Sequence, residues 1–186
     1  MDKLLHRAIA GVMWGGQEGR LPLFAWTLGL PQAELLEMIA QCFPLLQPLE
    51  PMTAAQYATV QANVPAEFHG MVTLLLAHAP CGAVEPPVRW LAHAHALAVA
   101  CGGNQHLWED LELDGRESVS RLLQHYFEPL YRRNTDNLRW KRFLYAELGA
   151  ALGIADMRAP GCSQCDSFYN CFPSTSTHIT HEHEDR

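Results

Sequence analysis

The sequence predicts an all-α protein, a single-domain bundle of about six to eight helices with a cysteine-containing loop after the last one. Alanine and leucine are abundant whereas valine, isoleucine and threonine are scarce, and this composition favours helices over strands. Apolar residues also recur at spacings of three and four, which is the period of one helix face.

Seven helical segments are expected, with proline and glycine between them. They lie near residues 2–13, 32–43, 53–63, 66–79, 87–101, 115–127 and 138–152. Gly15-Gly16 comes directly after the first helix, Pro31 precedes the second, and Gly102-Gly103 comes after the fifth. The sequence contains no internal repeat.

The two last helices carry signals at their ends. Asp114 with Glu117 is typical of a capping pair that starts the helix near residue 115. Gly153 suits the left-handed position that ends the helix of residues 138–152, and Ile154 can close over its last turn.

The last helix has one apolar face, on which we expect Trp140, Phe143, Leu144, Leu148, Ala151 and Leu152. Arg139 and Arg142 fall on the opposite face and are expected in solvent. The helix should therefore pack through Trp140.

Length and charge exclude several classes of protein. The 186 residues suffice for one domain with a core of its own, and the formal net charge of −7 argues against general nucleic-acid binding. Because the longest apolar run is far shorter than the roughly 18 residues of a membrane span, we expect no membrane crossing. No secretory signal is evident at the N-terminal end, so a cytoplasmic protein with reduced cysteines is expected.

Three cysteines close together form the candidate site. Cys162 and Cys165 are separated by two residues, and Cys171 comes after a short loop at 166–170. Thiolates at this spacing can reach one metal ion or cluster, and soft sulfur ligands favour iron–sulfur clusters, zinc or copper(I). We expect Cys42, Cys81 and Cys101, which are scattered over helices and helix ends, to be non-ligands.

The segment before these cysteines is basic. Residues 132–158 contain six arginines and lysines against three carboxylates, inside an acidic protein. Such a segment can attract an anionic cluster or an oxyanion such as molybdate, or it can be a solvated helix face.

The remaining motifs do not indicate catalysis. His93 and His95 fall on different faces of a helix and are expected to be packing or surface residues, as are His69 and His78. There is no Gly-rich phosphate loop, nucleophile elbow or HExxH motif. No catalytic constellation therefore supports an enzyme.

Three blocks of sequence carry a family resemblance: residues 106–111 (HLWEDL), residues 133–143 (RNTDNLRWKRF), and residues 158–165 (RAPGCSQC) with the later Cys171-Phe172. In order and spacing they resemble the nitrogen-fixation family NifQ. The resemblance extends over about residues 86 to 173 and is slight before that.

This resemblance implies a helical protein that holds molybdenum in a molybdenum–iron–sulfur cluster and supplies it for the iron–molybdenum cofactor of nitrogenase. The implied ligands are Cys162, Cys165 and Cys171. The implied partners are molybdate or the cluster itself and the scaffold proteins on which the cofactor is assembled, with no nucleic acid and no membrane.

One position departs from the family pattern. The family's motif has a fourth cysteine, separated from the CxxC by four intervening residues, and Met157 stands there in this chain. Three cysteines can hold three irons of a cubane and leave one metal corner open. Alternatively Cys101 or a histidine of the tail supplies the fourth ligand, or the site is weakened.

The expected organisation is a helical domain at 1–156, a metal-binding loop at 157–173 and a disordered tail at 174–186 that is rich in histidine and acidic residues. A second hypothesis remains open, in which Cys162, Cys165, Cys171 and a histidine such as His178 close a structural zinc site.

Overall fold

A computed structural model describes residues 2–47, 49–80, 84–102 and 105–172. Helices of seven residues or more occupy all seven segments that the sequence predicts. They are α1 (Lys3–Gln17), α2 (Gln32–Cys42), α3 (Ala54–Val60), α4 (Ala66–Ala77), α5 (Pro86–Cys101), α7 (Arg116–Tyr126) and α9 (Trp140–Leu152). The described residues include no β-strand, and the all-α prediction is therefore confirmed.

Five shorter elements were not predicted. They are the 3-10 helices η1 (Leu23–Thr27) and η2 (Cys162–Gln164) and the α-helices α6 (Leu107–Asp110), α8 (Glu128–Arg133) and α10 (Phe168–Cys171). Each has three to six residues, which is too few for an apolar repeat to show in the sequence.

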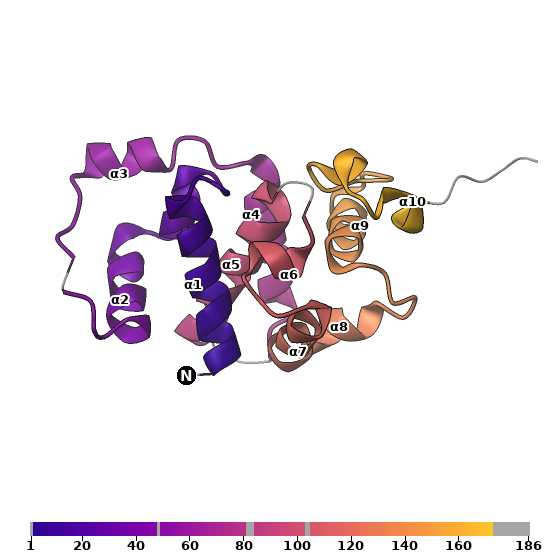
Figure 1. The fold of residues 1–186 in the computed structure, drawn as a ribbon, viewed down its shortest axis with the longest axis horizontal. Coiled ribbons are helices and arrows are strands. Elements are labelled where there is room, and N and C mark those ends of the chain that lie inside the picture. The colour runs from indigo at the N-terminus through magenta and orange to yellow at the C-terminus, as the bar shows by residue number, and fades with distance from the viewer. Residues whose placement is uncertain (1, 48, 81–83, 103–104, 173–186) are drawn as a thin grey trace, which may run out of the picture.

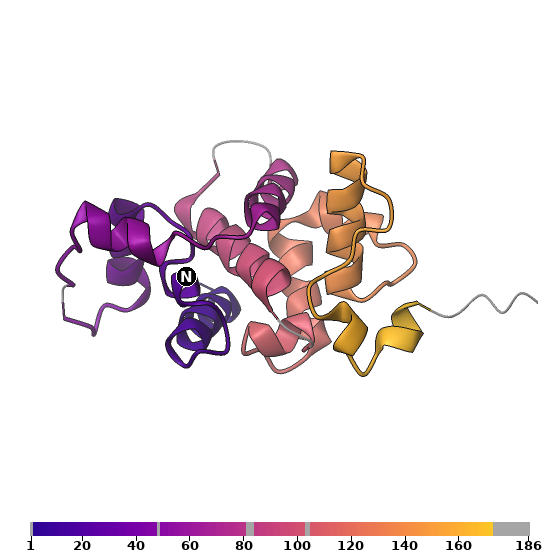
Figure 2. The same ribbon diagram turned by 90° about the horizontal axis from the view of Figure 1, so that it is seen from above.

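Helix α5 lies at the centre of the molecule, between α1 and α4 (Figures 1 and 2). It is buried nearly all round, and alanine occupies every second position from Ala92 to Ala100, which lets the neighbouring helices approach closely. Trp90, Leu91 and Leu97 fill the remaining space. Helix α9 packs against α4 on one side of this core, whereas α2 and α3 lie at the opposite end.

Helix α1 is longer than predicted and runs through Gly15 and Gly16 to Gln17. The helix continues through these glycines. Because they lack a side chain, η1 can pack directly against this face of α1. A Cβ at Gly16 would lie only 2.8 Å from the backbone nitrogen of Trp26. The Gly-Gly pair thus marks a close approach of two elements and not a boundary.

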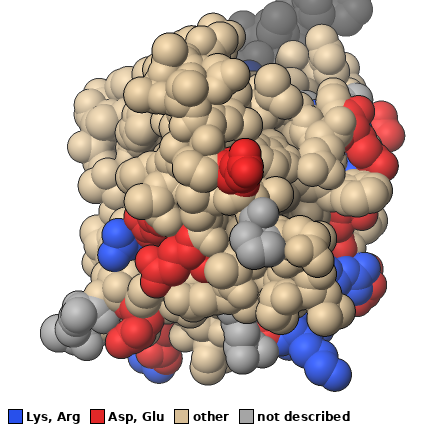
Figure 3. Space-filling view, turned by 90° about the vertical axis from the view of Figure 1, so that its left-hand side faces the viewer, with Lys and Arg blue, Asp and Glu red and all other residues tan. Residues whose placement is uncertain are grey.

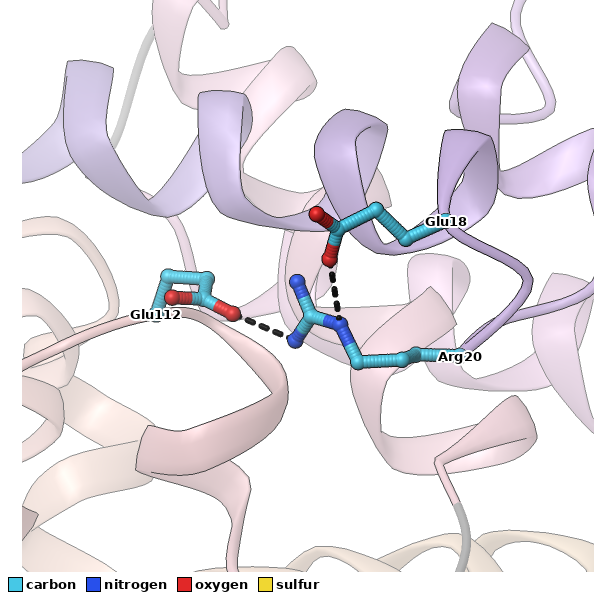
Figure 4. A network of polar contacts seen from close by, with 3 residues as sticks. All are labelled: Glu18, Arg20 and Glu112. Carbon is cyan, nitrogen blue, oxygen red and sulfur yellow. Dashed lines mark hydrogen bonds and ion pairs between the residues drawn. The ribbon is translucent and has the colours of Figure 1, made fainter.

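A polar contact joins the end of α1 to the turn between α6 and α7 (Figure 4). The Nε of Arg20 donates to Glu18 at 3.0 Å, and its Nη1 forms an ion pair with Glu112. The turn that contains Glu112 also lies against Gly11 of α1. Helix α1 therefore fixes the position of α6, which begins five residues earlier at Leu107.

The predicted cap of α7 is wrong. Gly115 occupies the N-cap position, and no side chain caps the helix there. The carboxylate of Asp114 instead lies 2.7 Å from the guanidinium of Arg7, because α7 packs beside α1.

The apolar face of α9 is confirmed in its first three turns, where Trp140, Phe143, Leu144 and Leu148 are buried. Ala151 and Leu152 were expected on this face but are exposed, since they lie one turn beyond the last buried leucine. Gly153 adopts the left-handed conformation that was predicted, with φ 70°. The backbone N–H of Ile154 donates to the carbonyl of Gly149 at 2.8 Å, which closes the last turn.

The end of the molecule that carries α2 and α3 bears few charged side chains in its upper part, where α3 lies (Figure 3). Residues 51–66 contain no charged side chain at all. In the part of the chain that the structure describes, no helix has both the length and the apolar character needed to cross a membrane.

Gly11→Ala should destabilise the protein. A Cβ at this position would lie 2.6 Å from the carbonyl oxygen of Leu111 and 2.6 Å from the Cβ of Glu112. Since both atoms belong to the turn after α6, that turn must shift, and we expect a loss of about 1–3 kcal/mol in urea unfolding.

Gly115→Ala is the matched control, because a Cβ there meets nothing within 4 Å and the backbone is extended. It should cost only about 0.5–1 kcal/mol, because alanine is less favourable than glycine at an N-cap. Equal effects of the two substitutions would contradict the proposed close approach of α1 to this turn.

Candidate metal centre

The chain turns back along α9 after Gly153. Gly149 makes this possible, because a Cβ there would lie 2.6 Å from the carbonyl oxygen of Ile154 and 3.0 Å from the Cβ of Met157. Both views place the segment after α9 beside that helix (Figures 1 and 2). The cysteines are thereby carried back toward the beginning of α9.

The three cysteines lie in two short helical turns. Gly161, with φ 69°, leads into η2, and the N–H of Cys165 donates to the carbonyl of Cys162 at 3.3 Å. The tight turn expected for the CxxC is therefore present. Residues 166–170, expected as a loop, include the start of α10, in which the N–H of Cys171 donates to Ser167 at 3.1 Å.

Two arginines hold the end of this segment. The guanidinium of Arg158 lies 4.5 Å from the ring centroid of Phe172, and that of Arg142, on α9, lies 4.9 Å from the same centroid. Cation–π contacts of this kind contribute about 0.5–1 kcal/mol or more each. Phe172 thus ties α10 to α9 directly after Cys171.

A single cavity of about 70 Å³ collects all three cysteines. Its walls come from the beginnings of α6, α7 and α9 and from the C-terminal segment. The lining residues are Gln105, His106, Leu107, Trp108, Arg116, Val119, Arg139, Trp140, Lys141, Arg142, Ala159, Pro160, Cys162, Cys165 and Cys171. Cys171 is buried, whereas Cys162 and Cys165 are half-buried.

The cavity walls are cationic. Arg116, Arg139, Lys141 and Arg142 line the cavity, and no carboxylate is among its described lining residues. Arg139 and Arg142 were expected in solvent, and this prediction is wrong because the C-terminal segment folds over their side of α9. Of the basic segment at 132–158, Arg132 and Arg133 instead pair with carboxylates elsewhere.

Arg116 is held in place by the loop before α9. Its Nη2 donates to the side-chain oxygen of Asn137 at 2.6 Å and to the carbonyl of Leu138 at 3.0 Å. Asn134 stabilises the same loop, since its side chain accepts from the N–H of Leu138 at 2.8 Å. The polar residues of block 133–143 therefore shape the cavity where α9 begins.

A buried ion pair joins two of the walls. The Nζ of Lys141 lies 2.5 Å from Asp110 and donates to the carbonyl of Gln105 at 2.7 Å. The two side chains are only 13% and 6% exposed. Burial raises the pKa of Asp110, and the positive charge of Lys141 opposes this rise.

The thiols interact with one another and with the cations. Burial raises the pKa of Cys162, and the neighbouring Cys171 and Cys165 raise it further, whereas Arg158 and Lys141 lower it. A thiolate at this position is therefore disfavoured unless a metal or additional positive charge stabilises it.

The other described cysteines lie outside the cavity lining. Burial raises the pKa of Cys42 to about 11, and it raises that of Cys101 to about 12 with help from Glu67 and Asp110. Neither thiol shares the cavity with the three clustered cysteines. Cys81 and the tail at 174–186, with His178, lie outside the described residues.

Met157 does not line the cavity either, since it packs against the core beside Gly149. His93 and His95 are packing residues, as predicted. His95 is fully buried, and this burial lowers its pKa to about 4.

Within the described residues, no three histidine, cysteine or acidic side chains converge closely enough to hold one metal ion. The three cysteines instead share the lining of one cavity.

Sequence reasoning assigned no role to His106, Trp108 and Arg116, although all three line the cavity. For His106 and Trp108 the available signal was the grouping of residues 106–111 with the cysteine block in the family resemblance, whereas Arg116 lies in none of the three blocks. The structure shows that these three blocks meet at one place.

The fold and the cavity define an all-α protein with a thiol-containing, cationic site. In a comparison with known protein families, the NifQ family model matches residues 8–173. The chain belongs to the NifQ family. No solved structure matches it.

Individual relatives match parts of the chain. A NifQ protein of Azotobacter vinelandii is 43% identical over 88 residues, 47% of this chain and 44% of the relative. A NifQ homolog of Sinorhizobium fredii is 33% identical over 147 residues, 78% of this chain and 60% of the relative. A NifQ protein of Rhodobacter capsulatus is 36% identical over 100 residues, which cover 54% of this chain and 53% of the relative. The matches thus span less than two thirds of the length of these relatives.

Lys141→Met should destabilise the protein by about 3–5 kcal/mol at neutral pH, because it leaves the buried Asp110 carboxylate without its cation. Removing Lys141 also removes the influence that lowers the pKa of Asp110. An acid whose pKa is raised by folding stabilises the fold at low pH and loses this contribution as the pH rises. The difference in free energy of unfolding between the parent and Lys141→Met should therefore shrink as the pH falls. Urea unfolding at several pH values measures this difference.

Arg132→Met provides the control, since its ion pair with Glu128 is exposed. This variant should lose less than about 1 kcal/mol. If the stability loss of Lys141→Met relative to the parent stays constant or grows on acidification, the role given to Asp110 is contradicted.

Proposed function

We propose that this protein acts in nitrogen fixation as a carrier of molybdenum, which it holds in a molybdenum–iron–sulfur cluster for assembly of the nitrogenase iron–molybdenum cofactor. The observation that carries the proposal is the gathering of Cys162, Cys165 and Cys171 in one cationic cavity. Membership of the NifQ family supports the same role.

The three thiolates are the proposed ligands of the cluster, which is the cargo of the protein. Metal binding displaces a proton from each thiol, and it would overcome the raised pKa of Cys162. Arginine side chains around the cavity favour a cluster whose net charge with its thiolates is negative. The uncapped beginning of α9, a helix of 13 residues, adds a positive dipole end on the same wall.

The placement of the ligands suits a carrier more than a catalyst. Cys162 and Cys165 are half-buried on a short turn at the protein surface, where an acceptor can approach the bound cluster. The proposed partners are molybdate or the preformed cluster as cargo, and the scaffold proteins of cofactor assembly as acceptors. None of the five described cysteines is in a disulfide, which agrees with a protein of the reducing cytoplasm.

Serine substitutions of Cys162, Cys165 or Cys171 should each lower the bound iron roughly tenfold or more, because a ligand of the cluster is lost. The measurement is elemental analysis for iron, molybdenum, zinc and sulfide after anaerobic purification. Cys42→Ala is the control, since Cys42 is buried away from the cavity, and it should keep the metal.

A colourless parent protein with one zinc and no sulfide would contradict the proposal and favour a structural zinc site. Equal iron loss in Cys42→Ala would contradict the ligand assignment.

Removal of the cluster should leave the helical body folded. The central core is built by α1, α4, α5 and their neighbours, before the cysteine segment begins. A chain of this size does not depend on a metal for its stability. We expect the helical circular dichroism of the chelated protein to match that of the loaded one. Loss of most of the helical signal on chelation would indicate a structural metal instead.

A further inference from the structure

We infer that His106 supplies the fourth protein ligand of the bound cluster, in place of the cysteine that Met157 replaces. This inference rests on the proposed function, since it concerns the same cluster. Three thiolates leave one metal corner of a four-metal cluster without a protein ligand.

Met157 is badly placed to fill that corner. It packs against the core, its Cβ lies beside Gly149, and it is not among the residues that line the cavity. Its thioether would also be a much weaker ligand for iron than a thiolate.

His106 lies in the cavity wall with all three cysteines. Among the described lining residues it is the one side chain, besides those cysteines, of a type that commonly binds transition metals in proteins. It is half-buried and directly precedes α6, whereas the cysteines come from the C-terminal segment. The cavity therefore brings an imidazole and three thiols together from parts of the chain about 60 residues apart.

The backbone and the ring of His106 are both held. The backbone N–H donates to the carboxylate of Glu109 at 2.6 Å, and the backbone carbonyl accepts from the N–H of Glu109 at 3.0 Å. The imidazole stacks on Trp108, with ring centroids 6.5 Å apart and an angle of 23° between the planes.

The wall that carries His106 is also fixed relative to α9. Lys141 binds both the carbonyl of Gln105, the preceding residue, and the carboxylate of Asp110 at the end of α6. The imidazole is thus placed before any metal binds, and such pre-placement lowers the entropic cost of binding.

An imidazole suits the chemistry of a carried cluster. Histidine can replace cysteine as a ligand of an iron–sulfur cluster, and as a neutral ligand it removes one negative charge from the assembly. The four donors need not converge on one atom, because each binds a different metal corner. The absence of a convergent group for one ion among the described residues is therefore compatible with this ligand set.

The test uses the full-length protein loaded and purified anaerobically, as parent, His106→Ala and His106→Cys. His125→Ala is the matched control, since His125 is an exposed histidine on α7 outside the cavity. Pulsed EPR of the reduced cluster measures nitrogen hyperfine coupling, with ¹⁵N-histidine labelling to assign it. Iron release to a chelator gives a second readout.

We expect a histidine coupling in the parent and in His125→Ala and none in His106→Ala, whose iron release should be roughly tenfold faster. His106→Cys should restore slow release without nitrogen coupling, which a merely structural role of His106 would not produce.

The inference is overturned if a cluster-containing parent shows no histidine coupling, or if the coupling persists in His106→Ala, as it would for a ligand from the tail. The proposed function itself fails in a distinguishable way, namely if the parent holds no iron and sulfide.

Discussion

The buried ion pair between Lys141 and Asp110 is the constraint on which the cavity depends. It joins the first turn of α9 to the last residue of α6, and Lys141 also binds Gln105 at the other end of the α6 segment. A buried ion pair seldom adds net stability over an apolar contact, but a charge left alone there is costly. The pair therefore fixes one arrangement of the two walls. His106, Arg139 and Arg142 take their positions in the cavity from this arrangement.

Charge is distributed unevenly between the cavity and the rest of the protein. The chain is acidic overall, with a formal charge of −7, yet arginines gather where the three cysteines lie. Arg116 is oriented by the loop at Asn137, and Arg142 and Arg158 lie against the ring of Phe172. Lys141 is neutralised by Asp110, so the arginines provide the excess positive charge. A basic cavity in a protein of negative net charge favours binding of an anion at that place over binding elsewhere.

The sequence predicts the seven longer helices because each contains several turns of apolar periodicity, whereas α6, α8 and α10 are too short to show one. It also predicts which cysteines gather, since Cys162, Cys165 and Cys171 are neighbours along the chain. It does not predict the arginines of α9 correctly, because the periodicity of a single helix cannot reveal that residues 153–172 fold over its polar side. His106 and Arg116 reach the cavity only through the packing of α6 and α7. The sequence pointed to His106 only through a block shared with one family, and it did not point to Arg116.

In the proposed carrier role a cluster must be held firmly and still be given up, and the placement of the three cysteines would separate these requirements in space. Cys171 is buried next to Phe172, which two arginines hold against the body of the protein. Cys162 and Cys165 lie on the half-exposed turn after Gly161, and that turn is connected to the body by a short segment. If the cluster binds as proposed, thiolates of an acceptor would approach from the side of this turn while Cys171 and His106, which precedes α6, still held it. Exchange that begins at Cys162 and Cys165 and ends at Cys171 would keep the cluster bound to protein throughout the transfer.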